Sequence, residues 1–96
     1  MFSGIPIDMK KIPAVMRNRE LLRAAIMAEL DAVSLYEQMA AATDDKNLKI
    51  VFEDVAKEEK THIGEFQTLL LRLDKDQESE LAAGRKEVEE LTGRRK

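Results

Sequence analysis

Several residue types that mark common functional classes are absent from this sequence. It contains no cysteine, which excludes disulfides, zinc fingers, cysteine-ligated iron–sulfur clusters and thiol catalysis. No apolar run approaches the roughly 20 residues that span a bilayer, and Pro6, Asp8 and the Lys10-Lys11 pair make the N-terminus a poor signal peptide. The net charge of only −3 argues against a nucleic-acid binder that neutralises phosphates. We therefore expect no nucleic-acid or membrane partner and a cytoplasmic location by default.

The length of 96 residues is enough for one small domain. A chain of this size buries only about two-thirds of its unfolded surface, so self-association would stabilise it considerably. Gly4, Pro6 and Pro13 discourage regular structure and predict an extended N-terminal arm over residues 1–17. A helical domain is expected over residues 18–93, followed by a disordered tail over residues 94–96.

Within this domain, apolar residues recur in alternating steps of four and three, which is typical of α-helices. The pattern predicts an all-α fold: an antiparallel two-helix hairpin and a shorter C-terminal helix, covering about residues 19–42, 48–73 and 75–91. Asn18 is a candidate N-cap for the first helix, and a start near Pro13 is the alternative. The segment Thr43-Asp44-Asp45 supplies turn and N-cap residues. Asp74 with Gln77 resembles a capping box before the third helix, and Gly93 is a natural stop.

Three polar residues interrupt the apolar seams of the first two helices. Glu59 and His62, the only histidine, occupy seam positions where leucine or valine is expected. Glu29 repeats this anomaly on the first helix, between Ile26 and Val33. Burying an unpaired carboxylate costs several kcal/mol or forces it neutral. A metal ion is the leading candidate for the compensating charge.

The turn places these residues at the same height in the hairpin. Glu29 lies 15 residues before Asp44 and Glu59 lies 15 residues after it, so both sit roughly 22 Å from the turn. His62 is one helical turn from Glu59 on the same face. Two carboxylates and an imidazole that converge in an apolar setting predict a site for iron, manganese or zinc.

One chain carries only half of a known ligand set. Di-iron and di-manganese carboxylate bundles use a Glu from each of two helices and a Glu-x-x-His from each of the other two. A twofold homodimer would supply the other half and complete a four-helix bundle. The same dimer would explain the unusually broad apolar faces of the two long helices.

Other interpretations remain open from the residues alone. A lone Glu-x-x-His usually lies on a solvated helix face, and buried polar residues can simply set register in a metal-free helical dimerisation module. Tyr36 lies one heptad from Glu29 on the same seam. Two interpretations remain: its hydroxyl forms a hydrogen bond near the metal site, or Tyr36 is an ordinary core residue. Four further acidic residues fall off the seams and are interpreted as surface charges: Asp31, Asp54, Glu58 and Glu65.

Two segments of the sequence resemble the encapsulated ferritins. They are residues 28–38 (Ala28-Glu29-Leu30-Asp31-Ala32-Val33-Ser34-Leu35-Tyr36-Glu37-Gln38) and residues 58–62 (Glu58-Glu59-Lys60-Thr61-His62). The similarity covers about residues 19–93. It implies a ferritin-like fold cut in half, whose metal ligands Glu29, Glu59 and His62 from two chains bind two irons, with Tyr36 close by. It also implies ferroxidase activity, a ring of five dimers, and iron storage inside an encapsulin shell.

The sequence departs from this family in two respects. Some members carry acidic residues just before and two after the first ligand, as an outer site through which metal enters. Here those positions are Ala28 and Asp31, so that site is partial at best. Members reach the shell through a C-terminal extension or by fusion to the shell protein. Neither is visible before Lys96, so shell association follows from the resemblance alone.

A rubrerythrin-like di-iron peroxidase is the second enzymatic interpretation, weakened by the lack of cysteines for a rubredoxin-type electron donor.

Overall fold

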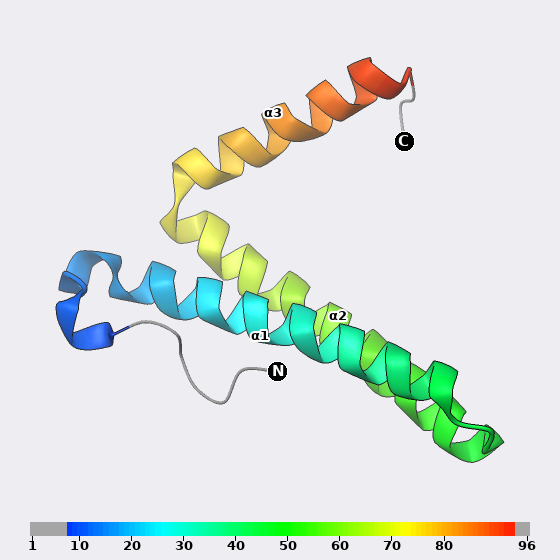
Figure 1. Cartoon of the computed structure of the whole chain (residues 1–96). Coiled ribbons are helices and arrows are strands. Elements are labelled where there is room, and N and C mark those ends of the chain that lie inside the picture. Colours follow the sequence, from blue (N-terminus) through cyan, green and yellow to red (C-terminus); the bar gives the residue numbers. More distant parts are fainter. Residues whose placement is uncertain (1–7, 94–96) are drawn as a thin grey trace.

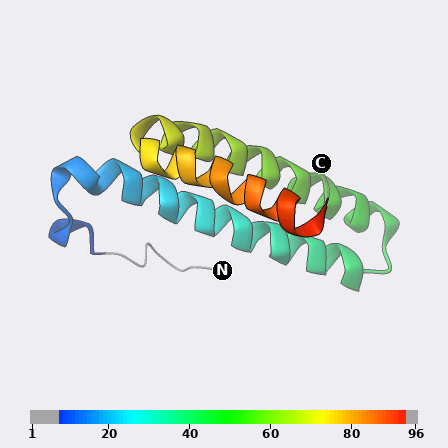
Figure 2. The same ribbon diagram turned by 90° about the horizontal axis from the view of Figure 1, so that it is seen from above.

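The computed structural model describes residues 8–93, and three α-helices make up most of that segment. The helix α1 spans Ala14–Ala42, α2 spans Lys46–Leu73 and α3 spans Lys75–Thr92, while a short 3-10 helix, η1, spans Met9–Lys11. The helices α1 and α2 form a long antiparallel hairpin, and α3 turns back at the end of α2 and diverges from it (Figure 1). Seen from above, α3 runs over the hairpin (Figure 2). No strand occurs in residues 8–93, which confirms the all-α prediction.

The helix α1 begins earlier than our main prediction. It starts at Ala14, directly after Pro13, whose backbone φ of −54° leads readily into a helix. The alternative start near Pro13 is therefore confirmed, and the prediction that Asn18 caps the helix is wrong, since Asn18 lies inside it. Helix thus occupies residues 14–17 of the expected arm, and residues 1–7 and the predicted tail at 94–96 lie outside the described residues.

The helix ends carry the capping residues that we expected. The side chain of Asp45 accepts hydrogen bonds from two amides in the first turn of α2, at 2.8 and 3.0 Å. The side chain of Asp74 accepts one from the amide of Gln77 at 3.1 Å, at the start of α3. Gly93 ends α3 in the left-handed conformation, with a φ of 69°, which glycine adopts without strain.

The core of the single chain is made mostly of alanine. Among the described residues, five apolar ones are buried: Ala24, Ala32, Ala40, Ala56 and Leu70. Their small side chains allow α1 and α2 to approach closely. No large side chain among the described residues is fully buried, and large apolar residues remain exposed on every α-helix, up to Leu91 at 86%. Apolar surface of this extent is typical of an interaction surface.

None of the helices in residues 8–93 is both long enough and apolar enough to cross a membrane.

Candidate metal centre

Three side chains of the types that bind metals converge where α1 packs against α2. Glu59 and His62 come from α2, one turn apart, and Glu29 comes from α1. The Nδ1 atom of His62 lies 3.3 Å from Oε2 of Glu29 and 3.7 Å from Oε1 of Glu59. One ligand atom from each residue lies within 4.8 Å of the other two. The predicted convergence of these three residues is therefore observed, while their role as ligands stays a prediction.

The carboxylates of this cluster lie in a partly dry environment. The side chain of Glu29 is 21% exposed and that of Glu59 is 17% exposed, whereas His62 is more open at 43%. The hydrogen bond with Glu29 raises the pKa of Glu59 above its ordinary value of 4.5, and burial and the negative charge of Glu29 raise it further. His62 acts in the opposite direction. The raised pKa indicates that the surroundings of Glu59 do not fully stabilise its negative charge.

The arrangement fits a metal ion in chemistry and in scale. Carboxylates and a neutral imidazole are ligands that iron, manganese and zinc all accept. Because metal–oxygen and metal–nitrogen bonds are about 2.0–2.2 Å long, two ligands of one ion lie at most about 4.4 Å apart. The 3.3 and 3.7 Å separations around Nδ1 of His62 are within that limit. A bound cation would also neutralise the carboxylate charge that raises the pKa of Glu59.

The cluster is open on the side that continues as an apolar helix face. Leu69 lies seven residues after His62 and therefore on the same face of α2, and its side chain is 47% exposed. Val51, two turns before Glu59, is 57% exposed. One chain offers three ligand side chains here, so further ligands have to come from solvent, substrate or another chain.

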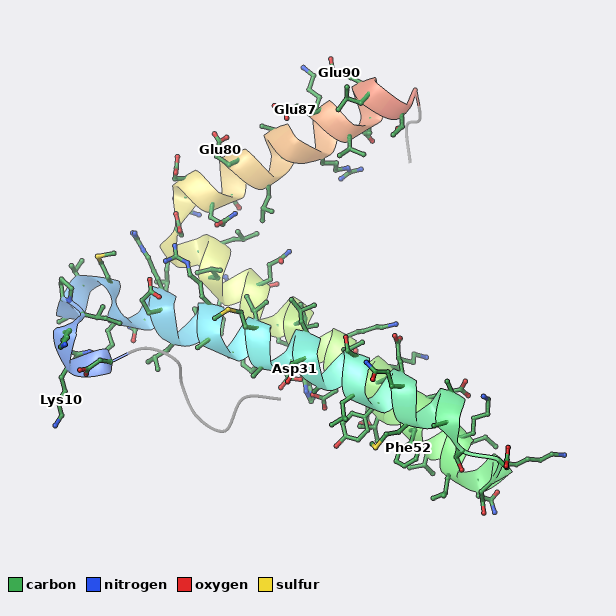
Figure 3. The ribbon with its side chains drawn as sticks, viewed as in Figure 1. Lys10, Asp31, Phe52, Glu80, Glu87 and Glu90 are labelled. Carbon is green, nitrogen blue, oxygen red and sulfur yellow. The ribbon has the colours of Figure 1, made fainter. Side chains whose placement is uncertain are left out.

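Tyr36 is the one predicted site residue that the structure does not place in this cluster. Within residues 8–93 its recorded contact is with Phe52, at a distance of 6.2 Å between ring centroids and an interplanar angle of 32°. Phe52 lies near the turn end of the hairpin (Figure 3). Counting residues outward from Asp44 in the turn, which pairs Glu29 with Glu59, also pairs Tyr36 with Phe52. Tyr36 lies eight residues before Asp44 and Phe52 lies eight residues after it. A role for Tyr36 at the metal stays a prediction.

The acidic residues off the seams mostly lie where we expected them. Asp54, Glu58 and Glu65 are exposed on α2. Asp31 differs, because it is half-buried and its Oδ2 atom is shielded from solvent (Figure 3). The prediction that Asp31 is a simple surface charge is therefore wrong, since the periodicity of one helix does not reveal what lies across it.

Comparisons with known proteins identify the family of this chain. The family model described as Rubrerythrin matches residues 20–93. The crystal structure of the encapsulated ferritin domain from Pyrococcus furiosus superposes with a TM-score of 0.83 at 48% identity, covering 94% of this chain and 97% of that one. The chain belongs to the encapsulated ferritin family. The predicted resemblance is confirmed, and the matching structure has the same helical fold.

Two curated relatives of this encapsulated ferritin are longer proteins. The ferritin-like-encapsulin shell fusion protein of Pyrococcus furiosus is 58% identical over 74 residues, which are 77% of this chain. The encapsulin nanocompartment cargo protein EncC of Myxococcus xanthus is 39% identical over 69 residues, which are 69% of this chain. The chain spans 21% and 53% of the lengths of these relatives.

Proposed function

We propose that this chain is a ferroxidase that oxidises Fe(II) to Fe(III) with dioxygen, at a di-iron site shared between two copies. The convergence of Glu29, Glu59 and His62, with one ligand atom from each within 4.8 Å of the other two, is the observation that carries the proposal. Membership of a ferritin-like family supports iron over the other metals that this ligand set accepts.

The number of ligands supports a site built from two chains. A ferritin-like di-iron centre uses four carboxylate-bearing helices, and one chain supplies two of them. A twofold axis beside the open face of Glu29, Glu59 and His62 would bring the same three residues from a second copy. It would also cover exposed residues such as Val51 and Leu69. The proposal includes the further assembly of these dimers into a ring of five.

The side chains of the proposed site favour oxidation of Fe(II) to Fe(III). When two irons are bound, each supplies one electron, and one dioxygen takes up both electrons with two protons to become hydrogen peroxide. Glu29 and Glu59 are hard anionic ligands, which stabilise Fe(III) more than Fe(II) and so favour oxidation. Protons and the cation compete for Glu59, whose pKa is raised in the metal-free protein, so binding of the cation becomes stronger as the pH rises.

The setting of this activity is inferred from the two curated relatives. One is named as a fusion to an encapsulin shell protein and the other as an encapsulin cargo protein. We extend this association to the present chain, as a cytoplasmic protein that oxidises iron for storage inside an encapsulin compartment. Production together with an encapsulin shell protein tests this part, and a chain that never sediments with the shells would contradict it.

Anaerobic loading with Fe(II), followed by admission of air, tests the proposed reaction. We expect stoichiometric uptake and rapid growth of ferric absorbance in the wild type. Both should be lost in Glu59→Ala and His62→Ala, with iron affinity falling by more than the roughly 10–100-fold that follows loss of a residue that only supports a ligand. Glu58→Ala is the matched control, because Glu58 is exposed beside the cluster. Normal oxidation by both ligand variants would rule out the site.

Two alternatives give different results in the same assay. The matched family model is described as Rubrerythrin, and a rubrerythrin-like peroxidase would oxidise its iron faster with hydrogen peroxide than with dioxygen. The absence of cysteine from the 96 residues excludes a rubredoxin-type donor within them. A metal-free dimerisation module would form dimers and take up no iron under any condition.

A further inference from the structure

A single residue separates α2 from α3. Asp74 is the one buried charged residue among residues 8–93, at 8% exposure. Its amide donates to the carbonyl of Leu70 at 2.9 Å, which ends α2, and its Oδ1 accepts from the amide of Gln77 at 3.1 Å, which begins α3. The direction of α3 relative to the hairpin therefore depends on very few backbone torsions.

Two arginines of α1 hold this junction from the other side. Arg23 Nη2 donates to Oδ2 of Asp74 at 2.8 Å, and Arg19 Nε donates to the carbonyl of Leu73 at 3.0 Å. Arg23 Nη1 also pairs with Glu20 at 2.8 Å, which restrains the guanidinium. The two arginines are four residues apart on one helix, so both reach the same junction. Bonds between charged groups that are partly shielded from water are stronger than exposed pairs.

Side-chain packing does little to orient α3. No residue of α3 is buried. Leu81 borders a groove of about 350 Å³ lined in part by Ile26, Met27 and Leu71, but it remains 42% exposed. Farther along, Val88 and Leu91 are 58% and 86% exposed. Figure 3 shows acidic residues of α3 pointing away from the hairpin: Glu80, Glu87 and Glu90.

We propose that Arg19, Arg23 and Asp74 form a lock that fixes the direction in which α3 leaves the hairpin. The lock thereby sets how the exposed apolar residues of α3 meet another copy; this consequence rests on the proposed oligomer. A helix of 18 residues is about 27 Å long, so a 20° rotation at the junction moves its far end by about 9 Å. The three residues are positioning residues, since Asp74 is about 18 Å along α2 from His62.

The lock is charged at neutral pH. The hydrogen bond from the amide of Gln77 lowers the pKa of Asp74 below its ordinary value, and Arg23 and Arg19 lower it further, against the opposing effect of burial. Because the pKa of Asp74 is lowered in the folded state, its ionised carboxylate stabilises the fold fully above the ordinary pKa of Asp74. This stabilisation is lost only as the pH falls through the lowered pKa.

Spin labels on paired cysteines test the lock directly, because the chain has no cysteine of its own. Gln38→Cys on α1 and Glu87→Cys on α3 are both exposed, and the largest dimension of 47 Å is within reach of pulsed dipolar EPR. Dilution with unlabelled protein removes distances between chains. We expect one narrow distance distribution in the wild-type background, and a distribution at least about twice as broad with Arg23→Met or Asp74→Asn.

These two variants are chosen to keep α3 folded. Asparagine is as good an N-cap as aspartate, and methionine retains the apolar stem of arginine. Circular dichroism checks helix content, and Arg85→Met, which removes an exposed contact with Glu89, is the matched control. An unchanged distance distribution in both variants would overturn the lock.

Native mass spectrometry of the two variants should show a changed or mixed assembly. An unchanged assembly with a broadened distance distribution would overturn the link to oligomerisation. Failure of iron oxidation in the wild type would instead count against the proposed function.

Discussion

At the scale of single residues, the cluster joins two carboxylates that repel each other in the absence of a cation. A hydrogen bond with Glu29 is the largest cause that raises the pKa of Glu59, ahead of burial and of the negative charge of Glu29. Each carboxylate was identifiable from the sequence, because it interrupts an otherwise apolar seam. The raised pKa of Glu59 was not, since it depends on the contact between two helices.

The raised pKa of Glu59 predicts a pH dependence for the metal-free protein. The folded state binds the proton of Glu59 more tightly than the unfolded chain does, so the contribution of Glu59 to stability is greatest below its ordinary pKa of 4.5. It should fall as the pH rises through the raised pKa. Glu59→Gln removes this loss, and at neutral pH we expect this variant to unfold at a higher urea concentration than the metal-free wild type does. Urea unfolding in the presence of a chelator, at several pH values between about 4 and 8, measures the effect.

Glu58→Gln provides the comparison, because Glu58 is exposed on the neighbouring position. Because the charge of Glu58 is the smallest of the contributions that raise the pKa of Glu59, Glu58→Gln should shift the pH profile of the wild type only slightly. If Glu59→Gln follows the wild-type profile as well, the carboxylate pair does not retain a proton.

At the scale of the helices, the caps and periods account for most of the observed boundaries. Asp45, Asp74 and Gly93 all act at the helix ends where their residue types predict them. The start of α1 was harder to predict, because both Asn18 and Pro13 are suitable starts by local chemistry. The longer helix is the one observed, although residues 14–18 are exposed, and with either start Arg19 and Arg23 lie within α1, from which they reach the junction at Asp74.

The interior glycine of α2 provides a prediction at this scale. A Cβ added to Gly64 would have no neighbour within 4 Å, and the backbone is helical. Alanine is favoured over glycine in a helix by about 0.8–1.0 kcal/mol. Gly64→Ala should therefore raise Tm by about 4 °C or more in thermal unfolding followed by circular dichroism.

Gly93→Ala is the opposite case, since Gly93 has a φ of 69° that strains any residue with a Cβ. It should give no gain and should shorten α3. A lower Tm for Gly64→Ala would contradict the prediction and would indicate that another chain lies against this part of α2.

At the scale of the whole molecule, the main feature is how little one chain buries. Within residues 8–93, four of the five buried apolar residues are alanines, and large apolar side chains remain exposed on all three α-helices. The predicted broad apolar faces are therefore observed. Their burial in a dimer stays a prediction, supported by the half set of ligands that one chain carries.

A charge on the open face should separate assembly from ligand chemistry. In Leu69→Asp all three ligand residues remain, but the carboxylate would have to be buried in the dimer without a partner. We expect dissociation at micromolar concentrations and loss of iron oxidation, measured by analytical ultracentrifugation and ferric absorbance. Thr68→Asp is the matched control, because Thr68 is the exposed neighbour of Leu69 and its hydroxyl bonds only within α2. Full activity of Leu69→Asp as a monomer would contradict a shared site.

The sequence by itself determined the pairing of two long helices and the meeting of Glu29, Glu59 and His62. A helical period and one short turn are local properties, and together they set which residues lie at equal height. The tertiary structure alone decided the direction of α3 and the partial burial of Asp31. The pair formed by Arg23 and Asp74 joins residues 51 positions apart. No local pattern specifies such a contact, because it depends on how the hairpin and the junction lie in space.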